Sequence, residues 1–399
     1  MIDALTLAMN KSVSSRTVSH LSIPKDLFHL VTSSHPNQPP RISPPSSDPE
    51  GLQQALEIMR SAKQPMILVG SSIQLNSGVL QTLAEAWGCG IAMSYGAIRI
   101  VPDAYPYMLN GLGEGGNPFL TDLFKESDVV LALETDWWPE QNAPSHARVV
   151  QIARQSETIG ISLPMDAGLI GDIRVNVLQM IEGLKNYTRN PLWINRIQRC
   201  KQTWSAHNEK EGKHAQSPLH PSSIIRAIER NINDDAIIAL DEGDSTLWFL
   251  RNFRAQHQQV LLSNRWRTMG FGLPAAMASK LCFPQKQIVC ITGDGGLGMV
   301  LADLLTAKHY GLVITVIVFQ NGTLQMEQDK MFMKGIQPEG TTLTNPDFAM
   351  VASAFGWLAH RITNTEQLED ALNQAKTSHI PVLLDVDTEQ IPHPDFQTS

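Results

Sequence analysis

Two polar residues, Asp294 and Asn321, have the types and the spacing expected of a metal and phosphate site. Asp294 follows an apolar run at 288–291, and Asn321 comes at the end of a second, β-branched run at 313–318. A stretch with leucines at helical spacing separates the runs, so the segment is predicted to form strand, turn, helix and strand. A right-handed parallel crossover places both residues at the C-terminal edge of a sheet, where open α/β sheets bind ligands.

The chemistry predicted for this edge is that of a magnesium-bridged diphosphate. Mg²⁺ takes one or two protein carboxylates together with phosphate oxygens and water, and the Asn321 carboxamide adds another oxygen. Gly295 and Gly296 leave backbone N–H groups open to a phosphate, and the helix that follows points its N-terminus toward it. The plainer interpretation is a tight turn in which Asp294 only caps a helix, and the strands on both sides argue against it.

The segment that begins with Gly-Asp-Gly at 293–295 and ends at Asn321 is similar to the thiamine diphosphate motif. In that enzyme family the motif runs from Gly-Asp-Gly to a terminal Asn-Asn, whereas this chain has Gln320 in place of the first Asn. The resemblance implies that Asp294, Asn321 and the backbone carbonyl of Thr323 bind Mg²⁺. It also implies that the metal holds the diphosphate of the cofactor.

Two further stretches resemble the acetolactate synthase and pyruvate oxidase group of this family. Residues 267–276 (RTMGFGLPAA) are similar to its Gly-Ser/Thr-Met-Gly-Phe-Gly-Leu-Pro-Ala-Ala stretch, which implies that Met269 is the residue wedged under the thiazolium rather than an ordinary core methionine. Residues 241–245 (DEGDS) resemble the Asp-Val-Gly turn that contacts the diphosphate, although a carboxylate at Asp244 would repel phosphates. The cofactor-binding residues that the resemblance implies are Gly243, Ser245, Met269, Gly293, Gly295 and Gly296.

Thiamine diphosphate carries the chemistry of these enzymes, and the protein supplies position and a proton relay. In the family the relay begins with a glutamate near the start of a pyrimidine-binding domain, and acid–base help of this kind is worth about 10²–10⁴-fold. We expect no segment of this sequence to supply that glutamate. The catalytic candidate within the chain is Glu327, because relatives place substrate-contacting side chains after the motif. The alternative is that Glu327 to Lys330 form an exposed helical face.

The order of the patterns predicts an α/β protein with a Rossmann-like central domain followed by a thiamine-diphosphate-binding fold domain, both with parallel sheets flanked by helices. In the central domain, strands are expected at 65–70, 127–133 and 147–152 and a helix at 77–87. The five expected segments are a remnant of the pyrimidine-binding domain (1–28), a Pro/Ser-rich linker (29–49), the central domain (50–185), a connector (186–217) and the diphosphate-binding domain (218–399).

The first residues carry a resemblance of their own. Residues 18–26 (VSHLSIPKD) are similar to the last strand of the family's pyrimidine-binding domain, which ends in His-Leu-Ser-Ile-Pro-x-Asp. We expect a helix over residues 1–11 and a strand over 18–23. The resemblance implies that only the tail of that domain is present and that the chain is truncated.

Residues 111–116 (GLGEGG) match the letters of a dinucleotide-binding fingerprint. We expect this loop not to bind a dinucleotide, because no apolar strand is predicted before it and Asn117-Pro118 follows where a helix should begin. Some relatives nevertheless bind FAD with the central domain. Trp137 and Trp138 are therefore interpreted either as packing residues or as flavin contacts.

Composition excludes several classes of partner. The net charge of −8 argues against binding nucleic acid. No apolar run is long enough to span a membrane, and the N-terminus lacks the pattern of a signal peptide. The four cysteines show no metal or redox spacing, which indicates reduced thiols in a cytoplasmic protein.

Three functional interpretations remain open. The first is a truncated thiamine diphosphate- and Mg²⁺-binding protein of the 2-keto acid decarboxylase type, weakly active or inactive alone, and the tail at 18–24 favours it. The second is a diphosphate-binding subunit completed by a separate pyrimidine-domain subunit. The third is a non-catalytic nucleotide-binding module. The expected substrate is a 2-keto acid such as pyruvate, the expected assembly is a homo-oligomer or a two-subunit enzyme, and an oxidising acceptor or a second keto acid would trap the carbanion.

Overall fold

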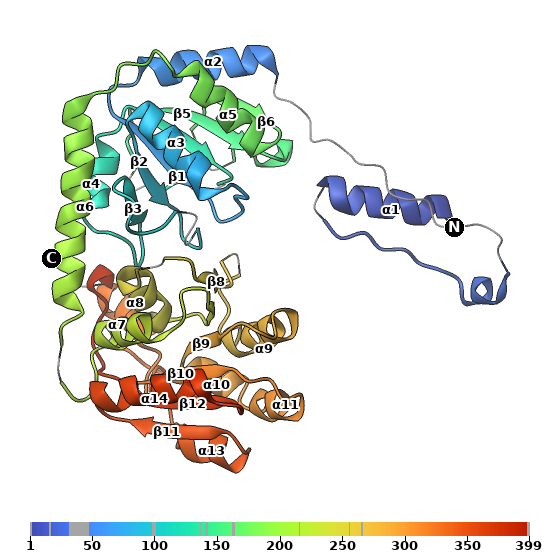
Figure 1. Ribbon diagram of the computed structural model, residues 1–399, viewed down its shortest axis with the longest axis vertical. Coiled ribbons are helices and arrows are strands. Elements are labelled where there is room, and N and C mark those ends of the chain that lie inside the picture. Colours follow the sequence, from blue (N-terminus) through green and yellow to red (C-terminus); the bar gives the residue numbers. More distant parts are fainter. Residues whose placement is uncertain are drawn as a thin grey trace.

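Two six-stranded sheets, each with parallel strands only, dominate the computed structural model (Figure 1). The structure describes residues 2–15, 17–31, 48–97, 101–135, 137–139, 143–161, 164–214, 216–254, 256–264 and 266–396. Helices flank both sheets, as the predicted fold class requires. Within the described parts of the chain, none of the helices combines the length and the apolar character that a membrane crossing requires.

The central sheet has the strand order β3-β2-β1-β4-β5-β6. The chain reverses direction across the sheet between β1 and β4, so the switch point of this doubly wound fold lies between these strands. Its elements are α2 (Pro49–Ser61), β1 (Pro65–Val69), α3 (Ser77–Trp87), β2 (Gly90–Met93), β3 (Met108–Gly111), α4 (Leu120–Lys125), β4 (Val129–Leu133), β5 (Arg148–Ala153), η2 (Ser156–Thr158), β6 (Ala167–Ile170) and α5 (Ile173–Gly183).

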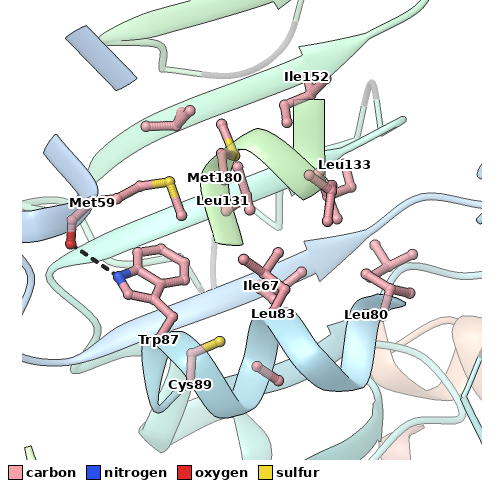
Figure 2. Close-up of a cluster of buried hydrophobic side chains, with 14 of the residues drawn as sticks. Met59, Ile67, Leu80, Leu83, Trp87, Cys89, Leu131, Leu133, Ile152 and Met180 are labelled. Atoms are coloured by element: carbon pink, nitrogen blue, oxygen red, sulfur yellow. Dashed lines mark hydrogen bonds between the residues drawn. The ribbon is translucent and has the colours of Figure 1, made fainter. Parts of the chain in front are cut away.

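The core of this unit is built where α3 packs on the sheet (Figure 2). Leu80, Leu83 and Trp87 lie on one face of α3 and are fully buried. The Trp87 indole N–H donates a hydrogen bond of 2.9 Å to the carbonyl of Met59 in α2. A buried indole therefore keeps a partner for its only donor, which is the usual condition for burying tryptophan.

The second sheet has the order β11-β12-β10-β9-β7-β8. Strands β9 and β10 are direct neighbours, and helices α10 and α11 lie between them in the chain, as the predicted strand–turn–helix–strand segment requires. Its elements are α7 (Pro221–Asn231), β7 (Ile237–Leu240), α8 (Asp244–Asn252), β8 (Gln259–Leu261), α9 (Gly272–Cys282), β9 (Ile288–Gly293), α10 (Asp294–Met299), α11 (Asp303–His309), β10 (Thr315–Gln320), α12 (Gln325–Met333), α13 (Phe348–Ala354), β11 (Leu358–Ile362), α14 (Thr365–Thr377), β12 (Val382–Asp387) and η3 (Pro394–Phe396).

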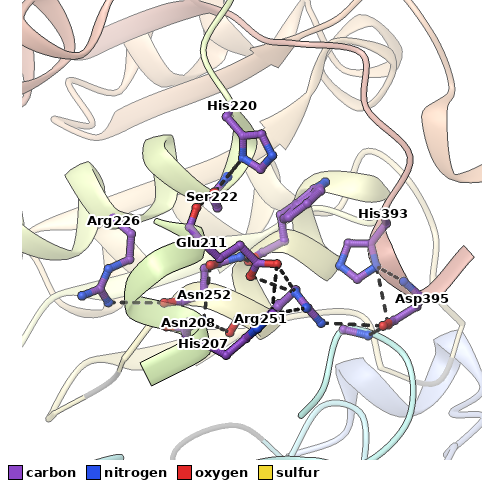
Figure 3. Close-up of polar contacts among 12 residues, drawn as sticks. His207, Asn208, Glu211, His220, Ser222, Arg226, Arg251, Asn252, His393 and Asp395 are labelled. Carbon is purple, nitrogen blue, oxygen red and sulfur yellow. Dashed lines mark hydrogen bonds and ion pairs between the residues drawn. The ribbon is translucent and has the colours of Figure 1, made fainter. Parts of the chain in front are cut away.

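Helix α6 (Pro191–Glu211) connects the two units and runs along one side of the molecule (Figure 1). Its C-terminal half is fixed to the second unit by the polar contacts drawn in Figure 3. The Arg251 Nε donates to both carboxylate oxygens of Glu211 at 2.9 Å, and the Asn208 side-chain amide donates to the carbonyl of Arg251 at 2.7 Å. Arg251 and Asn208 are buried, so these contacts hold the connector in one position.

The N-terminal segment lies apart from both sheets (Figure 1). Helix α1 (Ile2–Ser15) covers the helix predicted over 1–11, and η1 (Lys25–His29) follows. The strand predicted over 18–23 is wrong, because residues 17–24 form no strand. A strand needs a neighbour for its backbone N–H and C=O groups, and no described strand pairs with this segment. Most of the predicted linker, 32–47, lies outside the described residues, and the five segment boundaries stay a prediction.

Candidate functional site

Asp294 and Asn321 lie at the same, C-terminal edge of the second sheet. Asp294 is the first residue of α10, directly after β9, and Asn321 directly follows β10. Phe319 of β10 is opposite Gly293 of β9. The Asp294 Oδ2 accepts a hydrogen bond of 2.7 Å from the backbone N–H of Gly322. The predicted meeting of the two residues at one edge is confirmed, and their role as metal ligands stays a prediction.

The Asp294 carboxylate is only 3% exposed and is held by several N–H donors. Its Oδ1 accepts from the backbone N–H of Gly295 at 2.9 Å, and its Oδ2 also accepts from the side-chain amide of Asn345 at 2.7 Å. Burial raises the pKa of Asp294, and the hydrogen bonds from Gly322 and Asn345 act in the opposite direction. Asn345 was missed in the sequence, because it reaches the site from a loop that no local pattern links to Asp294.

The turn after β10 presents the oxygens predicted to complete a metal site. The Asn321 Oδ1 accepts from the backbone N–H of Thr323 at 3.1 Å, and the Thr323 Oγ1 donates to the carbonyl of Thr341 at 3.1 Å. Among the described residues, no group of three His, Cys, Asp or Glu could hold a metal. The candidate set is therefore one carboxylate with amide and carbonyl oxygens, a donor set that suits Mg²⁺ when phosphate and water complete its shell.

A cleft of about 710 Å³ lies above this edge. It brings together every residue predicted to bind cofactor or metal, and it also contains Glu327. The residues that line it are Glu242, Gly243, Asp244, Ser245, Arg267, Met269, Gly293, Asp294, Gly295, Gly296, Phe319, Asn321, Thr323, Leu324, Gln325, Met326, Glu327 and Thr388.

Glycines line the part of the cleft where the backbone lies close to the side chains of Met269 and Asp241. A Cβ atom on Gly295 would lie 3.0 Å from the Cε atom of Met269, and one on Gly296 would collide with the carboxylate of Asp241. A Cβ atom on Gly243 would meet nothing within 4 Å, so this turn faces open space. Met269 therefore lies against the Gly-Asp-Gly turn, and its position under a thiazolium ring stays a prediction. The open side at Gly243 has room for ligand atoms. These residues fit a bound diphosphate.

The turn after β7 is organised by Asp241, which sequence reasoning had not assigned. The Asp241 Oδ1 accepts from the backbone N–H groups of Glu242, at 2.9 Å, and Phe271, at 3.1 Å, while its Oδ2 accepts from the Thr292 hydroxyl at 2.7 Å. It thereby ties the turn to the Met269 segment and to β9. Helix α8 then begins without a side-chain cap, which leaves its first N–H groups available to a ligand.

Asp244 is the acid that the sequence predicted to repel phosphates. It lines the cleft, but its Oδ1 atom is buried and has no hydrogen-bond partner among the described residues. Burial raises the pKa of Asp244 well above its ordinary value, and the nearby Asp329 carboxylate raises it further. Relative to an exposed aspartate this environment favours the neutral form, which acts against the repulsion expected from a carboxylate.

Glu327 and Asp329 have opposite environments in α12. The Glu327 side chain is 54% exposed and accepts from the ammonium of Lys330 at 3.2 Å, as the exposed-face alternative describes. Asp329 is buried and accepts from the Gln325 side-chain amide at 2.6 Å and from the backbone N–H of His393 at 3.0 Å. Glu327 does line the cleft, and its catalytic role stays a prediction.

Comparison with known proteins places the two sheets in one family. The model of the C-terminal thiamine pyrophosphate-binding domain of thiamine pyrophosphate enzymes matches residues 241–386, and the model of their central domain matches residues 52–181. The thiamine pyrophosphate-containing protein YdaP of Bacillus subtilis is 30% identical over 388 residues, which are 96% of this chain and 67% of that protein. The chain belongs to the thiamine pyrophosphate enzyme family. Thiamine pyrophosphate is the cofactor called thiamine diphosphate above.

Other members of the family align over most of the chain. The pyruvate oxidase of Lactiplantibacillus plantarum is 25% identical over 394 residues, covering 95% of this chain and 64% of that protein. The acetolactate synthase large subunit of Parasynechococcus marenigrum is 26% identical over 386 residues, covering 92% of this chain and 62% of that protein. The chain thus spans about two thirds of the length of these thiamine pyrophosphate enzymes.

The glycine loop at 111–116 packs closely against α8 and the C-terminal segment. The expectation that no apolar strand precedes it is wrong in part, since the short strand β3 begins with the buried Met108 and Leu109 and ends at Gly111. However, β3 is the edge strand and not part of the switch point. The Gly115 N–H donates to the carboxylate of Asp395, and a Cβ atom on Gly115 would lie 3.0 Å from the carbonyl of Leu247. The glycine is explained by the close approach of the C-terminal domain.

A second cavity, of about 640 Å³, lies at the switch point of the central sheet. Both tryptophans pack on the core. Trp137 also lines this cavity, and the ring centroid of Trp138 lies 6.1 Å from that of Phe124. The two tryptophans, which the sequence left ambiguous, therefore have different surroundings. The lining residues are Ser71, Ser72, Ser94, Tyr95, Glu134, Thr135, Trp137, Asn264 and Arg267.

Proposed function

We propose that this chain binds thiamine diphosphate through Mg²⁺ in the cleft at the edge of the second sheet. The observation that carries the proposal is the geometry around Asp294, whose buried carboxylate meets the turn after β10 beside the Gly295 backbone. Asp294, Asn321 and the carbonyl of Thr323 would hold the metal. The hard oxygen donors and the one carboxylate suit Mg²⁺ with a diphosphate.

The remaining contacts to the cofactor are proposed from the lining of the cleft. The N-terminal N–H groups of α8, next to Gly243 and Ser245, would face the diphosphate. Gly293 and Gly296 would leave room for its oxygens, and Met269 would support the thiazolium ring. All five residues line the same cleft.

The proposed reaction class is decarboxylation of a 2-keto acid such as pyruvate. When bound, the cofactor supplies the carbon nucleophile and stores the electron pair that remains after loss of CO₂, and the protein positions the reactants. Two aligned relatives are named pyruvate oxidase and acetolactate synthase, which supports a pyruvate-like substrate. The contribution of this chain is to orient the cofactor, and Glu327 is the candidate to contact the substrate.

We also propose that residues 1–399 form only the diphosphate half of the catalytic site. The pyrimidine ring would be contacted by a further polypeptide segment or by a separate subunit, and the assembly would be a homo-oligomer or a two-subunit enzyme. A polypeptide of these 399 residues should then bind the cofactor but turn over pyruvate weakly. Steady-state decarboxylation by the purified chain, at a rate that an added pyrimidine-domain subunit does not increase, would contradict this.

Calorimetric titration of the purified chain with thiamine diphosphate tests the proposed cofactor. Binding should require Mg²⁺ and should be lost in Asp294→Ala. Equal heats for the wild type and the variant, or equal heats with and without Mg²⁺, would refute the proposal.

FAD is a second candidate ligand on the strength of one observation, the polar cavity at the switch point of the central sheet, where open α/β sheets bind nucleotides. The hydroxyls of Ser71, Ser72 and Thr135 and the ring of Trp137 would contact it. The nucleotide-binding module considered above would instead use the sheet edge that carries Asp294. Thermal melting tests binding in the central cavity. FAD or ADP bound there at a saturating concentration should raise the melting temperature of Asp294→Ala as well as that of the wild type.

A further inference from the structure

An ion pair between Glu242 and Arg267 lies in the wall of the cofactor cleft. The Arg267 Nε donates to the Glu242 Oε1 at 2.7 Å, and both residues line the cleft. Glu242 stands where the similar family turn has Val, and Arg267 stands where the similar family stretch has Gly. The two departures from the family pattern are therefore in direct contact.

Because of where Glu242 lies, an anionic ligand can bind in the cleft only if the charge of Glu242 is neutralised by Arg267. Glu242 is next to Gly243, the turn proposed to lie under the diphosphate, and it is only 6% exposed. An unpaired carboxylate here would repel a diphosphate with little screening by water. Arg267 is the only cationic side chain among the described residues that line the cleft.

The central domain holds the pair in place. The Tyr95 hydroxyl donates to Glu242 at 3.0 Å, and the Arg267 guanidinium lies 4.3 Å above the centroid of the Tyr95 ring. A second acid, Glu114, accepts from the Arg267 Nη1 at 2.9 Å. Burial and the charge of Glu242 raise the pKa of Tyr95, so its phenol keeps the proton that it donates. The turn at 241–243 is thereby fixed against another domain.

Arg267 has a strained backbone conformation. Its φ is +49°, in the left-handed region that glycine adopts without penalty. A strained residue persists where its surroundings hold it, and such strain is concentrated at functional sites. A glycine would relieve the strain but would leave Glu242 without its cation.

We infer that Arg267 is a positioning residue, which neutralises Glu242 and fixes the 241–243 turn so that an anionic diphosphate can lie on Gly243. The inference rests on the proposed function, because it assigns a role toward the proposed cofactor. The two residues would act on charge at the cleft in different ways. Asp294 would attract a cation, and Arg267 would remove the repulsion between Glu242 and the diphosphate.

Calorimetry on Arg267→Gly, Glu242→Val and the double variant tests this role. The probes are thiamine diphosphate and inorganic pyrophosphate, each with Mg²⁺, since pyrophosphate carries only the charged part of the cofactor. Arg267→Gly should bind both at least about tenfold more weakly than the wild type, because it exposes the ligand to an unpaired Glu242. Glu242→Val should not bind more weakly, and the double variant should return to within about threefold of the wild type.

A merely structural role predicts a different pattern, in which both single variants lose affinity and the double variant loses most. That pattern, or an Arg267→Gly variant that binds like the wild type, would overturn the inference and leave the proposed function standing. If the wild type binds neither probe with Mg²⁺, the proposed function fails and the inference with it. Circular dichroism melts check that each variant is folded, and Arg267→Lys, which keeps the charge, should retain more affinity than Arg267→Gly.

Discussion

The carboxylate of Asp294 and the backbone N–H of Gly322 are joined by a hydrogen bond of 2.7 Å, although 28 residues separate them in the chain. Parallel pairing of β9 with β10 produces this contact, because it brings the C-terminal ends of both strands to one place. The contact fixes the distance between the acid and the turn that carries Asn321. The site is thus a consequence of strand order.

Asn345 should control how well the Asp294 carboxylate is held. Replacing Asn345 by Ala removes a 2.7 Å hydrogen bond to Asp294 Oδ2, and a bond to a charged group is worth about 1.5–3 kcal/mol. The variant should therefore bind thiamine diphosphate with Mg²⁺ more weakly by about tenfold or more, measured by calorimetry. Asn373→Ala, on the exposed part of α14, is the control and should bind as the wild type does.

We expect that a side chain at position 296 would not be tolerated. A Cβ atom there would collide with the Asp241 carboxylate, which anchors the β7 turn and cannot move freely. We expect Gly296→Ala to lower the free energy of unfolding by about 1–3 kcal/mol, as overpacking does, and to weaken cofactor binding. Gly298→Ala is the matched control in the same helix, since its Cβ would meet nothing within 4 Å. Equal melting temperatures for the two variants would count against the described packing.

Asp244 should make the protein without ligand less stable as the pH rises. Its pKa is raised in the folded state, so the folded protein binds more protons than the unfolded chain. The stability associated with the neutral acid is complete below the unfolded pKa and is lost as the pH increases above it. Asp244→Asn should therefore stabilise the protein more at pH 7 than at pH 4, as a larger rise in melting temperature. The gain in the free energy of unfolding at pH 7 should be on the order of 1–3 kcal/mol. A gain that is the same at both pH values, or a loss at pH 7, would show that burial of this carboxyl is not the cause.

The sequence predicted the elements that carry the site because apolar periodicity and turn residues are local signals. The helix expected at 77–87 is α3, and the strands expected at 65–70, 127–133 and 147–152 agree with β1, β4 and β5 to within a few residues. Strand order then follows from the βαβ rule, which explains why the position of Asp294 beside the β10 turn was predictable.

Contacts between distant segments were not predictable in this way. The bond from Asn345 to Asp294 and the contact between Glu242 and Arg267 join loops that share no periodic pattern. The strand expected over 18–23 failed for the related reason that a strand depends on a partner elsewhere in the chain. Cytoplasmic localisation and the absence of a nucleic-acid partner remain predictions from composition.

The most direct test of the central claim is the binding of thiamine diphosphate to the purified chain, measured by calorimetry in the presence of Mg²⁺ and again with excess chelator. We predict saturable binding of one cofactor per chain that disappears with the chelator and in Asp294→Ala, while the far-ultraviolet circular dichroism of that variant stays that of the wild type. Binding that persists unchanged after removal of Mg²⁺ or of the Asp294 carboxylate would contradict the assignment of this sheet edge as a metal–diphosphate site.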